Sequence, residues 1–162
     1  MKRTKVFFIA LLAIILLTGC VEAKEPHHNE DSNQVVIEQI TENLSVKKIG
    51  DEMVITTPYG DLKYPFAFSD IIHIEEEFTD EVQKIHFSVK TENFSHLIYT
   101  LTFGDEVGVL IGHIGDKIVS INIVTDDVES SAENKKIFTD AQKTVGDIIN
   151  SMYEWENYVP VA

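Results

Sequence analysis

Cysteine, basic residues and long apolar runs are scarce in this chain of 162 residues. The single cysteine excludes an internal disulfide framework and a cysteine-rich zinc site. Only 13 Lys and Arg side chains stand against 27 Asp and Glu, which gives a formal charge of −14. This balance argues against a nucleic-acid partner, because binding to phosphates needs clustered basic side chains. The hydrophobic fraction of 44% is normal for a globular protein, and the length suits one compact domain.

The first 20 residues have the pattern of an export signal. Lys2, Arg3 and Lys5 form a short basic start, and residues 6–17 are an unbroken apolar run. This run has 12 residues, whereas a membrane-spanning helix needs about 20. Small residues then precede Cys20, the only cysteine. A basic start, a short apolar segment and small residues before a cleavage point predict a secretory signal peptide.

The end of this leader, Leu17-Thr18-Gly19-Cys20, resembles the lipobox of bacterial lipoproteins. The resemblance implies that the thiol of Cys20 receives a diacylglyceryl group and that a signal peptidase cuts between Gly19 and Cys20. It therefore implies a protein anchored in the bilayer through the acylated Cys20, on the extracytoplasmic side of the cell membrane. Two acyl chains give stable attachment where one is marginal. The alternative is an ordinary cleaved signal followed by an incidental buried cysteine.

The chain divides into a leader, a spacer and one domain. We expect residues 1–19 to be the signal peptide and 20–34 to be the lipidated cysteine with a flexible acidic tether. We expect residues 35–162 to form a single domain. His27 and His28 lie in the tether, where exposed side chains are a better interpretation than a metal site. The mature chain keeps all 27 acidic and ten basic side chains, hence a side-chain charge of −17.

Short alternating apolar runs from residue 46 onward predict strands. The pair Gly-Asp recurs between runs at 50–51, 60–61, 104–105 and 115–116, and this pair is typical of hairpin connections. The expected strands are 46–49, 53–57, 62–66, 71–78, 82–90, 96–103, 107–114 and 117–125. Before them, Ile37, Ile40 and Leu44 have helical spacing, which indicates a short helix within 35–44.

One hairpin is predicted in detail. If Asp80-Glu81 is a two-residue turn, residues whose numbers sum to 161 face each other across the two strands. One face then carries the pairs Glu77/Lys84 and Glu75/His86, and the other carries Ile74/Phe87 and Ile72/Val89. Glu76 opposite Ile85 does not fit the apolar face, and we expect a bulge or a strand end there.

A C-terminal helix completes the predicted domain. Ser130 and Glu133 fit a capping box. An apolar stripe with helical period then comprises Ile137, Phe138, Ala141, Val145, Ile148, Ile149 and Met152. Such a stripe needs an apolar surface to cover. The predicted fold class is therefore α+β: an antiparallel β-sheet, built as a meander of short hairpins, packed by a C-terminal α-helix.

A second resemblance covers much of residues 53–125. The segment Thr57-Pro58-Tyr59-Gly60-Asp61-Leu62-Lys63-Tyr64-Pro65 precedes paired strands and then Leu101-Thr102-Phe103-Gly104. This layout is similar to small uncharacterised lipoproteins of Gram-positive bacteria, often from gut communities. The resemblance supports location and fold and implies no activity.

Catalytic signatures such as G-x-S-x-G, H-E-x-x-H and the P-loop are missing. Strand alternation places His73 and His86 on one face near Glu75, and His96 can join them from the next strand. Imidazoles with carboxylates can hold a transition metal. Because no ligand spacing is diagnostic, a solvated face with cross-strand ion pairs is the better interpretation, and we predict no metal and no cofactor.

Three further features have ordinary structural interpretations. Asp126, Asp127 and Glu129 lack the EF-hand pattern and suit a helix N-terminus. Gly108 and Gly112 fit close packing of a strand rather than a membrane-helix contact. The C-terminal aromatics Tyr153, Trp155 and Tyr158 are candidates for binding a partner. Trp155 also extends the helix stripe, which favours its partial burial.

These observations predict a membrane-anchored extracytoplasmic lipoprotein with a non-catalytic binding or accessory role. Its partner would be an envelope protein or a glycan. The alternative is a small envelope-directed hydrolase or metal-dependent enzyme, which requires that His73, His86 and nearby Glu residues converge in a pocket. A substrate-capture lipoprotein for a transporter is a third hypothesis, although the chain is short for a two-lobed binder.

Overall fold

The computed structural model describes residues 37–39, 41, 43–105, 107–125 and 130–161. These residues belong to one compact unit of the chain. Within them, no helix has the length and apolar character that crossing a bilayer requires. The predicted signal peptide, Cys20, the tether with its two histidines, and the acidic residues 126–129 lie outside the described residues.

The smaller of two antiparallel sheets is a meander. Its strands are β1 (Ile37–Gln39), β2 (Ser45–Ile49), β3 (Glu52–Thr56) and β4 (Asp61–Pro65), paired in chain order. The short helix expected within 35–44 is wrong, because residues 37–39 pair with β2 as an edge strand. Backbone pairing with a neighbouring strand outweighs the helical spacing of three apolar residues.

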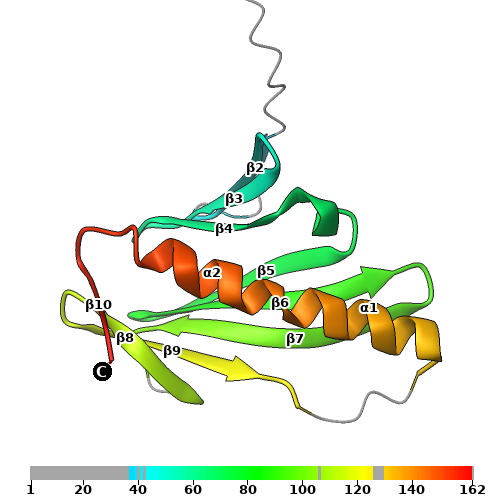
Figure 1. Cartoon of the computed structure of the whole chain (residues 1–162). Coiled ribbons are helices and arrows are strands. Elements are labelled where there is room, and N and C mark those ends of the chain that lie inside the picture. The colour runs from blue at the N-terminus through cyan, green and yellow to red at the C-terminus, as the bar shows by residue number, and fades with distance from the viewer. Residues whose placement is uncertain (1–36, 40, 42, 106, 126–129, 162) are drawn as a thin grey trace, which may run out of the picture. The chain divides into compact units, whose positions relative to one another are not determined.

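The short 3₁₀ helix η1 (Phe66–Phe68) leads the chain from β4 into the larger sheet. Its strands are β5 (Ile72–Thr79), β6 (Val82–Thr91), β7 (Phe94–Phe103), β8 (Val109–Ile114), β9 (Lys117–Ile123) and β10 (Tyr158–Pro160). They lie in the order β10-β8-β9-β7-β6-β5 (Figure 1). Because β9 lies between β7 and β8, the expected hairpin at Gly104-Asp105 is wrong, and this turn instead carries the chain to a non-adjacent position.

The predicted hairpin between β5 and β6 is confirmed residue by residue. Thr79 faces Val82, and the facing pairs continue to Ile72 and Val89 with no irregularity. The bulge or strand end expected at Glu76 is wrong, since Glu76 stays in register with Ile85. Its carboxylate instead accepts hydrogen bonds from the Thr41 hydroxyl and the Gln83 side-chain amide, which satisfy a charge on an otherwise apolar face.

The C-terminal helical segment consists of α1 (Ala132–Gln142) and α2 (Thr144–Met152). The cap is Ser131, whose side-chain oxygen accepts from the Asn134 backbone N–H at 3.2 Å. The capping box expected at Ser130 is therefore wrong by one residue, and the Ser130 hydroxyl accepts from the Asn134 side chain. Figure 1 shows α1 and α2 following one another across one face of the larger sheet.

A single core joins both sheets and both helices. Its fully buried members include Phe87 and Phe103 of the larger sheet, Leu62 of the smaller sheet, and Ile148 and Met152 of α2. Burying each such side chain contributes about 1.5–3 kcal/mol. The predicted α+β class, with antiparallel strands packed by a C-terminal helical segment, is confirmed, and the strands divide between two sheets.

Candidate functional site

The face of the larger sheet opposite the helices carries His73 and His86. His73 Nε2 lies 3.2 Å from a Glu75 carboxylate oxygen, and both side chains are exposed (44% and 67%). His86 Nε2 lies 3.4 Å from Glu77, although its register partner is Glu75. The two histidines thus contact separate carboxylates on an open sheet face, which is the arrangement of a solvated strand surface.

The expectation that His96 joins this face is wrong. A register shift between Phe87 and Ser88, where β6 pairs with β7, adds one residue to β7 and brings His96 opposite Val89. One extra residue reverses the face on which a side chain lies. The His96 ring therefore packs edge-on against Phe138 of α1, with ring centroids 5.2 Å apart. Its Nε2 is buried and has no hydrogen-bond partner among the residues that the structure describes.

His86 also connects a short polar chain across three strands. Its Nδ1 lies 2.9 Å from the Thr100 hydroxyl, and its Nε2 faces Glu77. The hydrogen bond with His86, followed by the nearby Lys84 ammonium, lowers the pKa of Glu77 below its usual value. Across the part of the chain that the structure describes, no group of three His, Cys, Asp or Glu side chains is placed to hold a metal ion. The convergence that the metal-enzyme alternative requires is not formed by these residues.

The C-terminal aromatic residues have three different environments. Tyr153 is 59% exposed, Trp155 is partly buried and Tyr158 is buried. The Tyr158 hydroxyl donates to the Ile111 carbonyl at 2.7 Å, and its ring packs edge-on against Tyr153. The partial burial predicted for Trp155 is confirmed, but it does not extend the helix stripe, because α2 ends at Met152.

Trp155 fixes the loop between β3 and β4 to the C-terminal turn. Its indole N–H donates to the Asp61 carbonyl at 2.9 Å. The indole also lies against Gly60, where a Cβ atom would meet the ring at 2.6 Å. The neighbouring Tyr59 ring stacks on Phe103 of β7, with centroids 4.6 Å apart. These contacts hold residues 57–60 as one wall of a groove along β4.

Two hollows form this groove, which we call the β4–α2 groove. The larger hollow, of about 540 Å³, is lined by residues 56–61, Lys63, Glu154 and Trp155. The smaller, of about 240 Å³, is lined by Asp51, Glu52, residues 63–65, Asp147, Asn150, Ser151 and Glu154. Lys63 and Glu154 line both hollows and therefore lie at the boundary between them.

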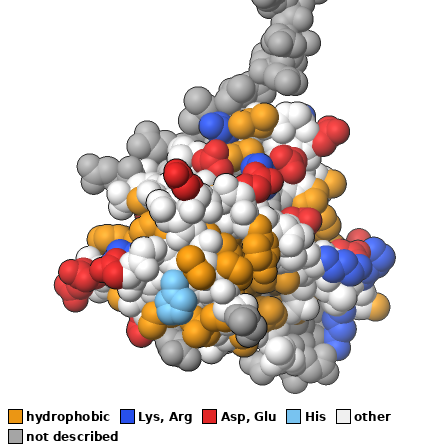
Figure 2. All heavy atoms as spheres, turned by 60° about the vertical axis from the view of Figure 1, so that its left-hand side comes forward, with side chains coloured by type: hydrophobic (Ala, Val, Ile, Leu, Met, Phe, Trp, Pro, Cys, Tyr) orange, Lys and Arg blue, Asp and Glu red, His pale blue; other side chains and the backbone are white. Residues whose placement is uncertain are grey.

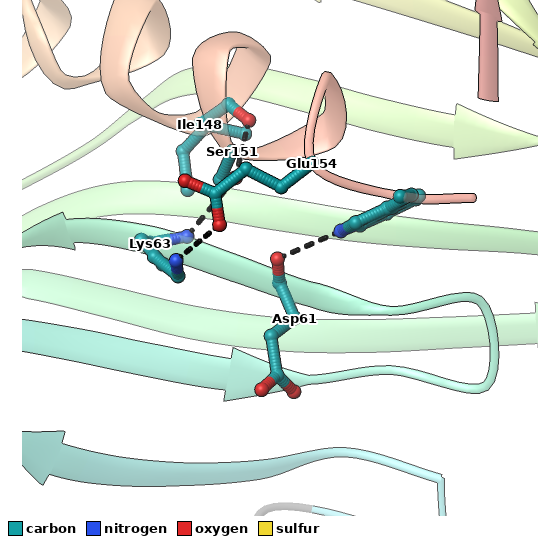
Figure 3. A network of polar contacts seen from close by, with 6 residues as sticks. Asp61, Lys63, Ile148, Ser151 and Glu154 are labelled. Atoms are coloured by element: carbon teal, nitrogen blue, oxygen red, sulfur yellow. Dashed lines mark hydrogen bonds and ion pairs between the residues drawn. The ribbon is translucent and has the colours of Figure 1, made fainter.

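At this boundary, the contacts in Figure 3 connect β4 to α2 and to the turn that follows α2. The Lys63 ammonium pairs with the Glu154 carboxylate, and this hydrogen bond is the main cause of a raised Lys63 pKa. The Lys63 backbone N–H donates to the Ser151 hydroxyl at 3.2 Å, and that hydroxyl donates to the Ile148 carbonyl at 2.7 Å. Lys63 of β4 thus contacts α2 through its backbone and the turn after α2 through its side chain.

No protein-family model, curated protein or solved structure matches this chain. The β4–α2 groove is the arrangement in the described residues that combines a concave surface with charged and aromatic side chains.

The sequence did not predict this groove. Residues 57–65 were interpreted only as turn and strand. Trp155 was proposed as a partner site, but its hydrogen bond to the Asp61 carbonyl was not predicted. The groove walls are more than 80 positions apart in the sequence, so no local spacing connects Lys63 to Glu154. The excess of acidic residues was the one available signal. Acidic side chains do gather on the face in Figure 2, beside a cluster of hydrophobic ones.

Proposed function

We propose that this chain is a lipoprotein, anchored by the acylated Cys20 on the extracytoplasmic side of the cell membrane, whose domain binds an envelope partner without catalysis. The observation that carries the proposal is Leu17-Thr18-Gly19-Cys20, placed directly after a basic start and an apolar run. This order is typical of a leader that is exported and cleaved. Two acyl chains on the cysteine provide stable attachment.

The charge of the mature chain supports an accessible domain. A side-chain charge of −17 repels the anionic headgroups of a bacterial membrane. Lipid, rather than a basic patch, therefore holds the protein at the surface, and the domain stays away from the bilayer. Its faces are then available to molecules of the envelope, and the β4–α2 groove is the binding surface that we assign.

Metabolic labelling with a radioactive fatty acid tests the anchor. Wild-type protein should carry the label and remain in the membrane fraction, whereas Cys20→Ser should lose both properties. Thr18→Ser is a matched control that keeps a small hydroxyl residue before the cysteine and should label normally. If wild type and Cys20→Ser both stay unlabelled and are released into the medium, the proposal is wrong.

An activity assay tests the absence of catalysis. Intact protein in detergent micelles is incubated with isolated cell wall and with envelope lipids, and products are followed by mass spectrometry. We expect no turnover above that of buffer alone. Turnover that depends on His73, His86 or Glu77 would replace the binding role with the enzymatic alternative.

A further inference from the structure

We propose that the β4–α2 groove binds an oligosaccharide that carries no acidic groups. The inference rests on the binding role proposed above and does not depend on acylation of Cys20. It starts from the shape of the groove, in which two neighbouring hollows of about 540 and 240 Å³ share Lys63 and Glu154 in their linings. The larger hollow has the volume of ordinary small-molecule sites, which span about 300–1,000 Å³. Two neighbouring hollows suit a ligand built of linked units.

Tyr59 supplies an apolar wall of the larger hollow. Its ring is partly buried and stacks on Phe103, with centroids 4.6 Å apart. A tyrosine held in this way offers contact area with little further loss of conformational entropy on binding. The C–H face of a pyranose ring packs well against an aromatic face. No hydrogen bond of the Tyr59 hydroxyl is found with any described residue, so this group is available to a ligand.

Lys63 and Glu154, which line both hollows, and Asp61, which lines the larger one, supply donors and acceptors to a ligand. The Lys63 ammonium donates to Glu154, and one Asp61 carboxylate oxygen accepts from the Thr56 hydroxyl at 2.8 Å. The Lys63 and Glu154 side chains are 30% and 64% exposed. An exposed ion pair contributes little to stability, so a ligand can compete for both partners. A sugar hydroxyl both donates and accepts, and therefore fits a lysine next to carboxylates.

The charge of the groove selects against acidic ligands. Its five carboxylates belong to Asp51, Glu52, Asp61, Asp147 and Glu154, and its one ammonium belongs to Lys63. Like charges brought together at an interface disfavour the wrong partner. The groove should therefore reject uronic acids and phosphate-bearing polymers. A polyamine would satisfy the carboxylates but would leave the aromatic wall and the donor at Lys63 unused.

The test compares two ligands of equal length on the intact chain in detergent micelles. Calorimetric titration with the uncharged tetramer of N-acetylglucosamine should show binding. Tetragalacturonate should bind at least about tenfold more weakly, a difference of about 1.4 kcal/mol. Failure of the uncharged tetramer to bind, or equal binding of both tetramers, would overturn the proposal. Binding of spermine without binding of the saccharide would identify a cation site and would also overturn it.

Variants locate the binding. Glu154→Gln and Tyr59→Leu should each weaken binding of the uncharged tetramer about tenfold, since each removes one group that contacts the ligand. Glu156→Gln is the matched control, because Glu156 is exposed in the same turn and lines neither hollow. Thermal unfolding confirms that each variant is folded, and Glu154→Gln remains informative if Tyr59→Leu is not.

Wild-type affinity in a folded Glu154→Gln variant would overturn the assignment of this groove. Fatty-acid labelling of the same preparations separates this result from failure of the anchor. A labelled Cys20 with no saccharide binding rejects only the ligand, whereas saccharide binding by an unlabelled chain rejects only the anchor.

Discussion

Trp155 is the residue at which three parts of the fold meet. Its N–H donates to the Asp61 carbonyl of β4, and its ring lies beside Phe103 of β7 and Tyr158 of β10. A buried indole is well used when its apolar ring packs and its single donor finds an acceptor. The residue type predicts partial burial, but Asp61 and Phe103 lie far from Trp155 in the sequence.

Gly60 should not tolerate a side chain. Replacing it with alanine places a Cβ 2.6 Å from the Trp155 indole, so the loop or the ring has to move. We expect Gly60→Ala to lower the free energy of unfolding by about 1–3 kcal/mol, measured by urea denaturation. Gly146→Ala is the control: it lies within α2 with open space around it, and it should raise stability by about 0.5–1 kcal/mol. Equal effects of the two substitutions would contradict the packing described for Trp155.

The buried Nε2 of His96, between β7 and α1, has no hydrogen-bond partner within the described part of the chain. Phenylalanine has a ring of similar shape and no such atom. At pH 7 we expect His96→Phe to increase the free energy of unfolding by about 1 kcal/mol, because it removes the cost of an unsatisfied buried group. His73→Phe on the opposite face should change it by less than about 0.5 kcal/mol, because that side chain is 44% exposed. A loss of stability in His96→Phe would show that Nε2 has a partner in solution.

At the scale of elements, local chemistry predicted most of the strands. The hairpin of β5 and β6 followed from a two-residue turn and opposite charges across the strands, and its register is confirmed in full. The bulge between β6 and β7 had no such signal, because Leu97, Ile98 and Tyr99 are all apolar and suit either register. Because this bulge was not predicted, His96 was assigned to the wrong face of the sheet. A shift by one residue reverses the face of every following side chain.

Helix α1 depends on its cap. The Ser131 hydroxyl accepts the Asn134 backbone N–H, a group that has no partner inside the helix. Ser131→Ala should therefore cost about 1 kcal/mol of the free energy of unfolding, measured by thermal denaturation. Ser130→Ala removes only a contact with the Asn134 side chain and should cost clearly less. A larger loss of stability in Ser130→Ala than in Ser131→Ala would instead support the capping box predicted at Ser130.

Asp140 gives α1 a measurable pH dependence. Hydrogen bonds from Lys136 and Lys143 lower its pKa from the usual 3.8 to about 2. A pKa that is lower in the folded state adds stability that is present above the unfolded value of 3.8 and lost as the pH falls towards 2. NMR titration of the side-chain carboxyl should show this pKa, and Lys136→Met should move it upward. An unchanged midpoint in Lys136→Met would contradict the pairing.

For the whole molecule, class and strand content were predictable and the assembly was not. Periodicity indicated strands followed by a helix, but it contains no information on which strands become neighbours in space. The insertion of β9 between β7 and β8, and the pairing of β10 with β8, depend on contacts between distant segments. The β4–α2 groove likewise depends on contacts between distant segments, since it forms only where β4 and α2 pack against each other.

Residues 153–161 complete both sheets, because Trp155 clamps the β3–β4 loop and β10 covers the edge of β8. This segment lies later in the chain than the strands that it contacts, so it is synthesised after them. While the chain is being made, the β3–β4 loop therefore stays unclamped and the edge of β8 stays uncovered until residues 153–161 emerge.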